Sequence, residues 1–128
     1  MLYKAPEMLT ATTSEPYNEK IDVWALGVIA FYLLSGGNFP FKSKYKAEVE
    51  QFIKENAPPM ELLGECSDLA RNFVEKCLNK DKGDRPSAKD LTNDDWFRAF
   101  KERRLEQGKQ SMKAISKNLV QFAVMNKF

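Results

Sequence analysis

The chain has 128 residues, 43% of them hydrophobic, and its 20 Lys+Arg against 18 Asp+Glu leave a formal net charge of +2. This is the composition of one globular domain, and it argues against wholesale disorder and against a basic nucleic-acid footprint over the whole chain. The absence of histidine excludes His-based triads, imidazole bases and His metal ligands, and two cysteines are too few for a disulfide framework.

The N-terminal part of the chain contains the clearest helix. Residues 1–19 are rich in turn signals. Residues 20–35 are apolar nearly all round, which predicts a helix buried on every side. Asn18 can cap its first turn, and Gly36-Gly37 can end it. The apolar run is shorter than the roughly 20 residues that cross a bilayer, and no secretory signal opens the chain. We therefore expect an intracellular, cytoplasmic protein without a membrane partner.

Three further helices are predicted between residues 44 and 100. The first covers residues 44–56 and the second runs from Ser67 to about Leu78, each with one apolar face. These faces comprise Tyr45, Val49, Phe52 and Ile53 in the first helix and Leu69, Phe73, Val74 and Cys77 in the second. Ser87 and Asp90 form a capping-box pattern that opens a helix continuing through Phe100. No β-strand pattern occurs, so the predicted class is all-α.

The last segment, residues 108–128, differs in charge. It contains four lysines and no acidic residue, and Met112, Ile115, Leu119 and Phe122 recur at steps of three and four. This pattern is typical of a basic amphipathic helix.

Three separated motifs resemble the lower half of a eukaryotic protein kinase domain, from its A-P-E motif onward. Residues 3–9 read Y-K-A-P-E-M-L, and residues 20–29 read K-I-D-V-W-A-L-G-V-I. Residues 78–81 read L-N-K-D, and residues 84–88 read D-R-P-S-A. Each motif alone is weak, but their order and separation are specific. The resemblance covers about residues 1–98 and implies a partial kinase C-lobe, a helical bundle followed by a C-terminal amphipathic helix.

The resemblance assigns structural roles to five residues. In the family the A-P-E glutamate pairs with an arginine near the end of the domain, and Glu7 and Arg85 match these positions; the alternative is two unrelated surface charges. Asp22 matches the aspartate that holds the catalytic-loop backbone, although an acid in the first turn is also favoured by the helix dipole. Trp24 and Gly27 match packing positions, and Gly27 costs the helix about 1 kcal/mol relative to alanine.

The catalytic parts of the family lie upstream of the A-P-E motif. The chain has no G-x-G-x-x-G loop, no H-R-D loop and no D-F-G aspartate. Met1-Leu2 stand where a Gly-Thr usually precedes the motif, so we expect a truncated domain. The resemblance implies ATP and magnesium for a full-length kinase, whereas we expect no catalytic, cofactor-binding or metal-binding residue in this chain and no activity from it alone. Its expected partners are the missing N-terminal kinase half and a protein substrate.

The C-terminal segment resembles the autoinhibitory junction of calcium-dependent protein kinases, and the motifs resemble the calcium/calmodulin-dependent group. Ile115, Leu119, Phe122 and Phe128 are spaced as anchors for the apolar groove of a calmodulin-like sensor. The alternative for this segment is a helix that packs on the domain. The alternative for the whole chain is a stand-alone helical binding module with a calmodulin-like or kinase partner. We therefore divide the chain into a kinase part at 1–98, a connecting helix at 99–107 and a regulatory helix at 108–128. Asp94 and Asp95 are expected to be solvated acids.

Overall fold

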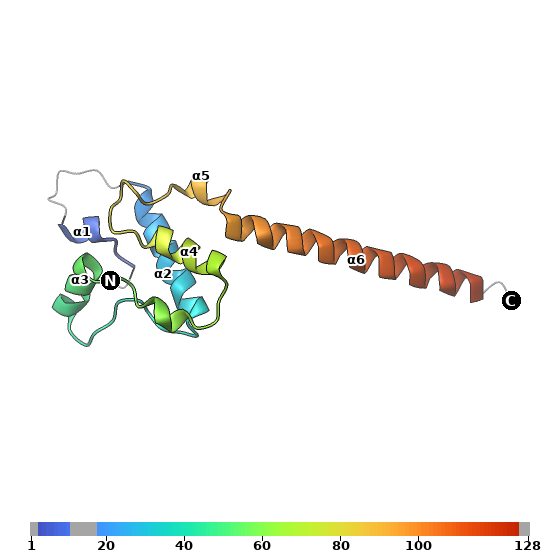
Figure 1. Cartoon of the computed structure of the whole chain (residues 1–128), viewed down its shortest axis with the longest axis horizontal. Coiled ribbons are helices and arrows are strands. Elements are labelled where there is room, and N and C mark those ends of the chain that lie inside the picture. The colour runs from blue at the N-terminus through green and yellow to red at the C-terminus, as the bar shows by residue number, and fades with distance from the viewer. Residues whose placement is uncertain (1–2, 11–17, 126–128) are drawn as a thin grey trace. The chain divides into compact units, whose positions relative to one another are not determined.

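The computed structural model describes residues 3–10 and 18–125, and these residues form helices and turns without a β-strand. The elements are α1 (Pro6–Thr10), α2 (Lys20–Leu34), α3 (Lys46–Glu55), the 3-10 helix η1 (Met60–Leu63), α4 (Asp68–Cys77), α5 (Ala88–Leu91) and α6 (Asp95–Met125) (Figure 1). The predicted all-α class is confirmed for this part of the chain. The chain divides into two compact units, one ending at Asp94 and one beginning at Asp95.

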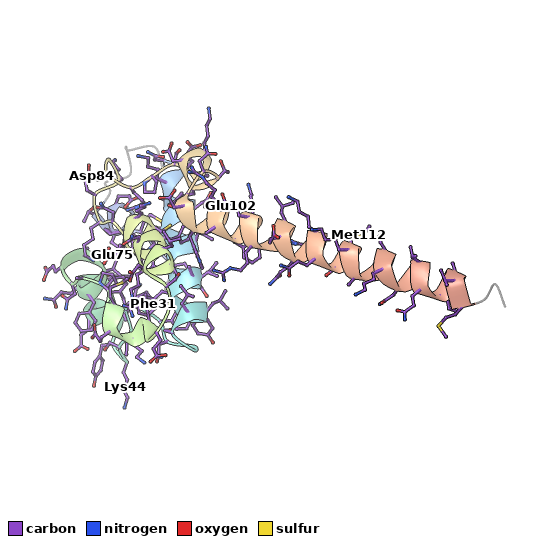
Figure 2. All side chains as sticks on the ribbon, turned by 45° about the vertical axis from the view of Figure 1, so that its right-hand side comes forward. Phe31, Lys44, Glu75, Asp84, Glu102 and Met112 are labelled. Carbon is purple, nitrogen blue, oxygen red and sulfur yellow. The ribbon has the colours of Figure 1, made fainter. Side chains whose placement is uncertain are left out.

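The core of the first unit lies between α2 and α4, and α1 packs against α3 (Figure 1). Trp24, Val28 and Phe31 of α2 are fully buried, as are Phe73 and Val74 of α4. These side chains follow the helical spacing that the sequence predicts for both helices. The side chain of Phe31 lies within this packed unit in Figure 2.

Gly27 of α2 lies close against the C-terminal end of α4. A Cβ atom added at Gly27 would lie 2.7 Å from Cys77 Cβ and 2.9 Å from Leu78 Cδ2. Real Cβ atoms do not approach one another this closely, so the packing of α4 requires glycine here. Glycine lowers the local stability of the helix relative to alanine, but it allows α2 and α4 to pack closely at this point.

The predicted helix ends are present. Asn18 Oδ1 accepts a hydrogen bond from the Lys20 amide at 2.9 Å. At the other end of α2, Gly36 has φ of 73° and the Gly37 amide donates to the Tyr32 carbonyl at 2.8 Å. This is a Schellman ending, in which the left-handed residue is glycine because a Cβ would be strained there.

The caps of α4 and α5 also follow the sequence. Ser67 Oγ accepts from the Ala70 amide at 3.2 Å. Ser87 Oγ accepts from the Asp90 amide at 3.1 Å, and Asp90 Oδ2 accepts from the Ser87 amide at 3.0 Å, which completes the capping box. These hydrogen bonds with Ser87 hold the pKa of Asp90 below its usual value.

The prediction that α2 is buried on every side is wrong. Leu26 is 39% exposed, Ile29 45% and Leu33 71%. These three residues lie at steps of three and four, so they form one stripe along the helix. α4 covers the opposite side of α2, and no other described element of the first unit covers this stripe.

Three local predictions also need correction. Tyr45 is 67% exposed, because its backbone is extended (φ −109°, ψ 126°) and it precedes α3 instead of lying on its buried face. The helix opened by Ser87 stops at Leu91, where amides of residues 92–94 bond three residues back and form turns. Asp94 is not a solvated acid: it is 8% exposed and pairs with Lys76 at 2.9 Å.

The second unit contains the single helix α6. It runs without interruption through the predicted 99–107 and 108–128 segments as far as Met125, and Gly108 lies within it. All side chains from residue 101 to 125 are exposed, and Figure 2 shows Met112 among those standing out from the ribbon. Over the described residues, no helix combines the length and the apolar character needed to span a membrane.

Candidate functional site

The candidate site of the first unit is built around the buried guanidinium of Arg85. Arg85 lies in the loop between α4 and α5 and is 1% exposed. Its Nη1 donates to Glu7 Oε1 at 2.7 Å, and its Nη2 donates to Glu7 Oε2 at 3.0 Å. Glu7 and Arg85, which the sequence analysis paired, thus form a bidentate ion pair. The planar guanidinium and the carboxylate match each other in this geometry.

Arg85 also binds two backbone carbonyl groups. Its Nη1 donates to the Lys20 carbonyl at 3.0 Å, and its Nε donates to the Asn79 carbonyl at 2.9 Å. The guanidinium carbon lies 5.1 Å from the ring centroid of Trp24, within cation–π range. One side chain therefore links α1, the start of α2 and the loop after α4.

The charge of Glu7 is set by competing effects. Burial raises the pKa of Glu7. The hydrogen bonds from Arg85 and from its own backbone amide, together with the positive charges of Arg85 and Lys82, lower this pKa by more than burial raises it. The net result is a pKa below the ordinary value of 4.5. Glu7 is therefore a carboxylate at neutral pH, and the buried cation of Arg85 is neutralised.

Trp24 lies at the centre of a second cluster, which includes a lysine that the sequence analysis did not single out. The indole stacks on Phe41, with ring centroids 5.9 Å apart. Lys80 Nζ lies 4.6 Å from the Phe41 ring centroid and 5.7 Å from that of Trp24. It also donates to the Ile53 carbonyl at 2.5 Å, so it binds the C-terminal end of α3.

Lys80 is partly buried, and this burial lowers its pKa to about 8. The signal that could have found it is its place in the L-N-K-D motif, one residue after the Asn79 carbonyl that Arg85 binds. Lys80 comes three residues after Cys77, the last and fully buried residue of α4, and its side chain lies over the Trp24 ring.

Asp22, unlike the buried Arg85, lies at the surface of the first unit. It lies in the first turn of α2 and is exposed, with no side-chain partner in the described part of the chain. Its position on the helix continues the exposed stripe of Leu26, Ile29 and Leu33 by one turn. One face of α2 thus combines a carboxylate at its N-terminal end with uncovered apolar side chains.

The anchors predicted in the C-terminal segment lie on α6. Ile115 is 53% exposed, Leu119 63% and Phe122 67%. Phe128, the fourth predicted anchor, lies outside the described residues. The three described anchors fall on one side of the helix because they are spaced by four and three residues.

Within the ranges 3–10 and 18–125, no group of three or more Cys, Asp or Glu side chains is arranged to hold a metal ion. Cys77 is fully buried, and burial raises the pKa of its thiol to about 12. This thiol therefore remains protonated and acts as an apolar core group.

Comparison with known proteins agrees with the motif series. Residues 1–97 match the protein kinase domain family. The chain is 41% identical over 90 residues to Sporulation-specific protein 1 of Saccharomyces cerevisiae, covering 70% of this chain and 18% of that protein. It is 35% identical over 99 residues to the ovarian-specific serine/threonine-protein kinase Lok of Drosophila melanogaster, covering 76% and 21%.

A third relative is serine/threonine-protein kinase H1 of Mus musculus, which is 36% identical over 98 residues, covering 73% of this chain and 22% of that protein. The chain thus spans about a fifth of the length of these relatives. The matched residues 1–97 include Glu7, Trp24 and Arg85, and where the structure describes them they form helices, loops and turns without a β-strand. This chain belongs to the protein kinase family.

Proposed function

We propose that this chain is the C-terminal part of a Ser/Thr protein kinase domain of the calcium/calmodulin-dependent type. In the full-length enzyme, which would use ATP and magnesium, its role is to support the catalytic loop and the protein-substrate side. The kinase family and the Ser/Thr kinase relatives support the Ser/Thr kinase part of this proposal. The calcium/calmodulin-dependent type is proposed from the resemblance of the sequence motifs and of the C-terminal segment. The chain alone is inactive, because it has neither the nucleotide motifs nor the metal-binding motifs of the family.

The observation that carries the proposal is the uncovered face of α2. A carboxylate at Asp22 followed by the apolar stripe of Leu26, Ile29 and Leu33 is suited to cover by another polypeptide segment. The carboxylate can accept backbone amides, while the stripe buries apolar side chains. Arg85 and Glu7 hold the start of α2 against the rest of the unit, so the face is presented rigidly.

The testing experiment measures the size of the native polypeptide. An antibody against residues 108–128 is used to detect the protein from its source cell on a denaturing gel. We expect a band well above the 14.7 kDa of this chain. A band only at 14.7 kDa would contradict the proposal, because such a polypeptide has no nucleotide site. In parallel, the purified chain with ATP and magnesium should phosphorylate no protein substrate.

A second candidate function is a helical binding module whose autoinhibitory-type helix docks a calmodulin-like calcium sensor. The exposed Ile115, Leu119 and Phe122, on a helix with lysines and no acid beyond Gly108, favour it. Titration of the full chain with calmodulin should show binding with calcium and none with a chelator. Leu119→Glu should abolish the binding, whereas Val124→Glu, an equal charge change at another exposed apolar residue, should preserve it.

A further inference from the structure

The exposed apolar side chains of α6 follow the pattern of a coiled-coil seam. Six successive positions with alternating steps of three and four carry Leu105, Gly108, Met112, Ile115, Leu119 and Phe122. All five side chains of this seam are more than half exposed. Alternation of three and four residues is the heptad spacing by which two helices interlock. A helix with such a seam gains most of its stability from packing, so a partner for the seam is expected.

The shape of the seam favours a second copy of this chain in antiparallel orientation. No heavy atom lies within 4 Å of a Cβ built at Gly108, so the seam has a notch there, flanked by Leu105 and Met112. Antiparallel pairing places Leu119 of one copy opposite Gly108 of the other, and Met112 opposite Ile115. Parallel pairing places Gly108 opposite Gly108 and leaves a void, which is costly in a packed seam.

The charges beside the seam favour the same orientation. In a parallel pair, the flanking Arg104 of one helix lies next to Lys109 of the other, which is a like-charge contact. In the antiparallel pair Lys109 lies next to Ser116, and this repulsion is absent. Lys113 and Lys117 lie away from the seam in both cases, so their ammonium groups stay in water.

We propose that two copies of this chain pair through α6 as an antiparallel coiled coil centred between Lys113 and Ala114. This inference does not rest on the proposed kinase function, because it concerns only the second unit. The pair uses Ile115, Leu119 and Phe122, which are also the anchors for a calcium sensor. Self-pairing and sensor binding therefore exclude each other.

Sedimentation equilibrium of the full chain tests the pairing. Wild-type protein should shift from monomer to dimer in the micromolar range. Ile115→Glu with Leu119→Glu should raise the dissociation constant at least about tenfold, because both charges enter the seam. Val120→Glu with Val124→Glu adds the same charge to exposed residues off the seam and should leave it unchanged. Monomer at all concentrations, or a dimer that survives the seam substitutions, would overturn the proposal.

A spin label distinguishes the two orientations. Gln121→Cys is labelled in a Cys66→Ser background; Cys77 stays unlabelled because it is buried and its thiol pKa is raised. In the antiparallel pair, residue 121 of one copy lies level with residue 106 of the other, so about 15 residues, or about 22 Å at 1.5 Å per residue, separate the two labels along the helix axis. Parallel pairing places the two labels side by side, at the same level of the axis. A side-by-side distance would overturn the orientation. Calmodulin binding by a chain that never dimerises would assign the seam to the sensor instead.

Discussion

Replacement of Arg85 by methionine removes the cation that links three segments of the first unit. Methionine keeps much of the side-chain volume but has no donor. The substitution leaves the Glu7 carboxylate and the carbonyl groups of Lys20 and Asn79 without their partner. Because Arg85 is 1% exposed, water cannot readily replace these four hydrogen bonds.

The expected loss is set by the stranded carboxylate. Removal of one partner of a buried ion pair costs about 3–5 kcal/mol of unfolding free energy. The Glu7 side chain is 16% exposed, so some water reaches it and the lower end of that range applies, about 3 kcal/mol. The double variant Glu7→Gln with Arg85→Met should recover part of this loss, since no buried charge then remains unpaired.

Urea unfolding in a Trp96→Phe background, followed by the fluorescence of the remaining Trp24, which contacts Arg85, measures the effect. Arg98→Met is the matched control: its pair with Asp95 spans 3.6 Å, and both side chains are more than 60% exposed. Loss of such an exposed pair should cost at most about 0.5 kcal/mol. An Arg85→Met variant whose unfolding free energy falls by less than about 1 kcal/mol would refute the reasoning. The Glu7 carboxylate would then be solvated or protonated at little cost.

Four further predictions concern helix packing, helix content and pH. Gly27→Ala should lower the unfolding free energy, because the clash with Cys77 (about 1–3 kcal/mol) outweighs the gain in helix propensity of about 1 kcal/mol. Gly108→Ala, whose Cβ meets no atom of its own chain, should instead raise the helix content measured by circular dichroism. The pKa of Glu7 is lowered on folding, so its stabilising effect is complete above the unfolded value near 4.5 and is lost as pH falls through the folded pKa; Glu7→Gln should flatten this part of the stability profile. Lys80 has a folded pKa of about 8 against 10.5, so the unfolded chain binds more protons between these values, and stability should rise with pH there in the wild type but not in Lys80→Met. An unchanged profile in either variant would show that the named group does not control it.

The helical class, the helix caps and the kinase motifs can all be predicted from the amino-acid sequence, because each depends on residues close together along the chain. Ser87 and Asp90 are three residues apart, so their reciprocal hydrogen bonds can be read directly from the sequence. The pairing of Glu7 with Arg85 required the family resemblance, since 78 residues separate them and no local pattern connects them.

Which helix faces are buried depends instead on how the helices pack against one another. Leu26 and Leu33 are as apolar as Val28, yet they are exposed, because helix burial depends on the number of neighbours and not on the composition of the helix alone. Asp94 is buried for the converse reason: the turns after α5 bring it to Lys76, a partner 18 residues away in sequence. Local spacing predicts where a helix lies, but the packed neighbours determine which of its side chains remain available for another partner.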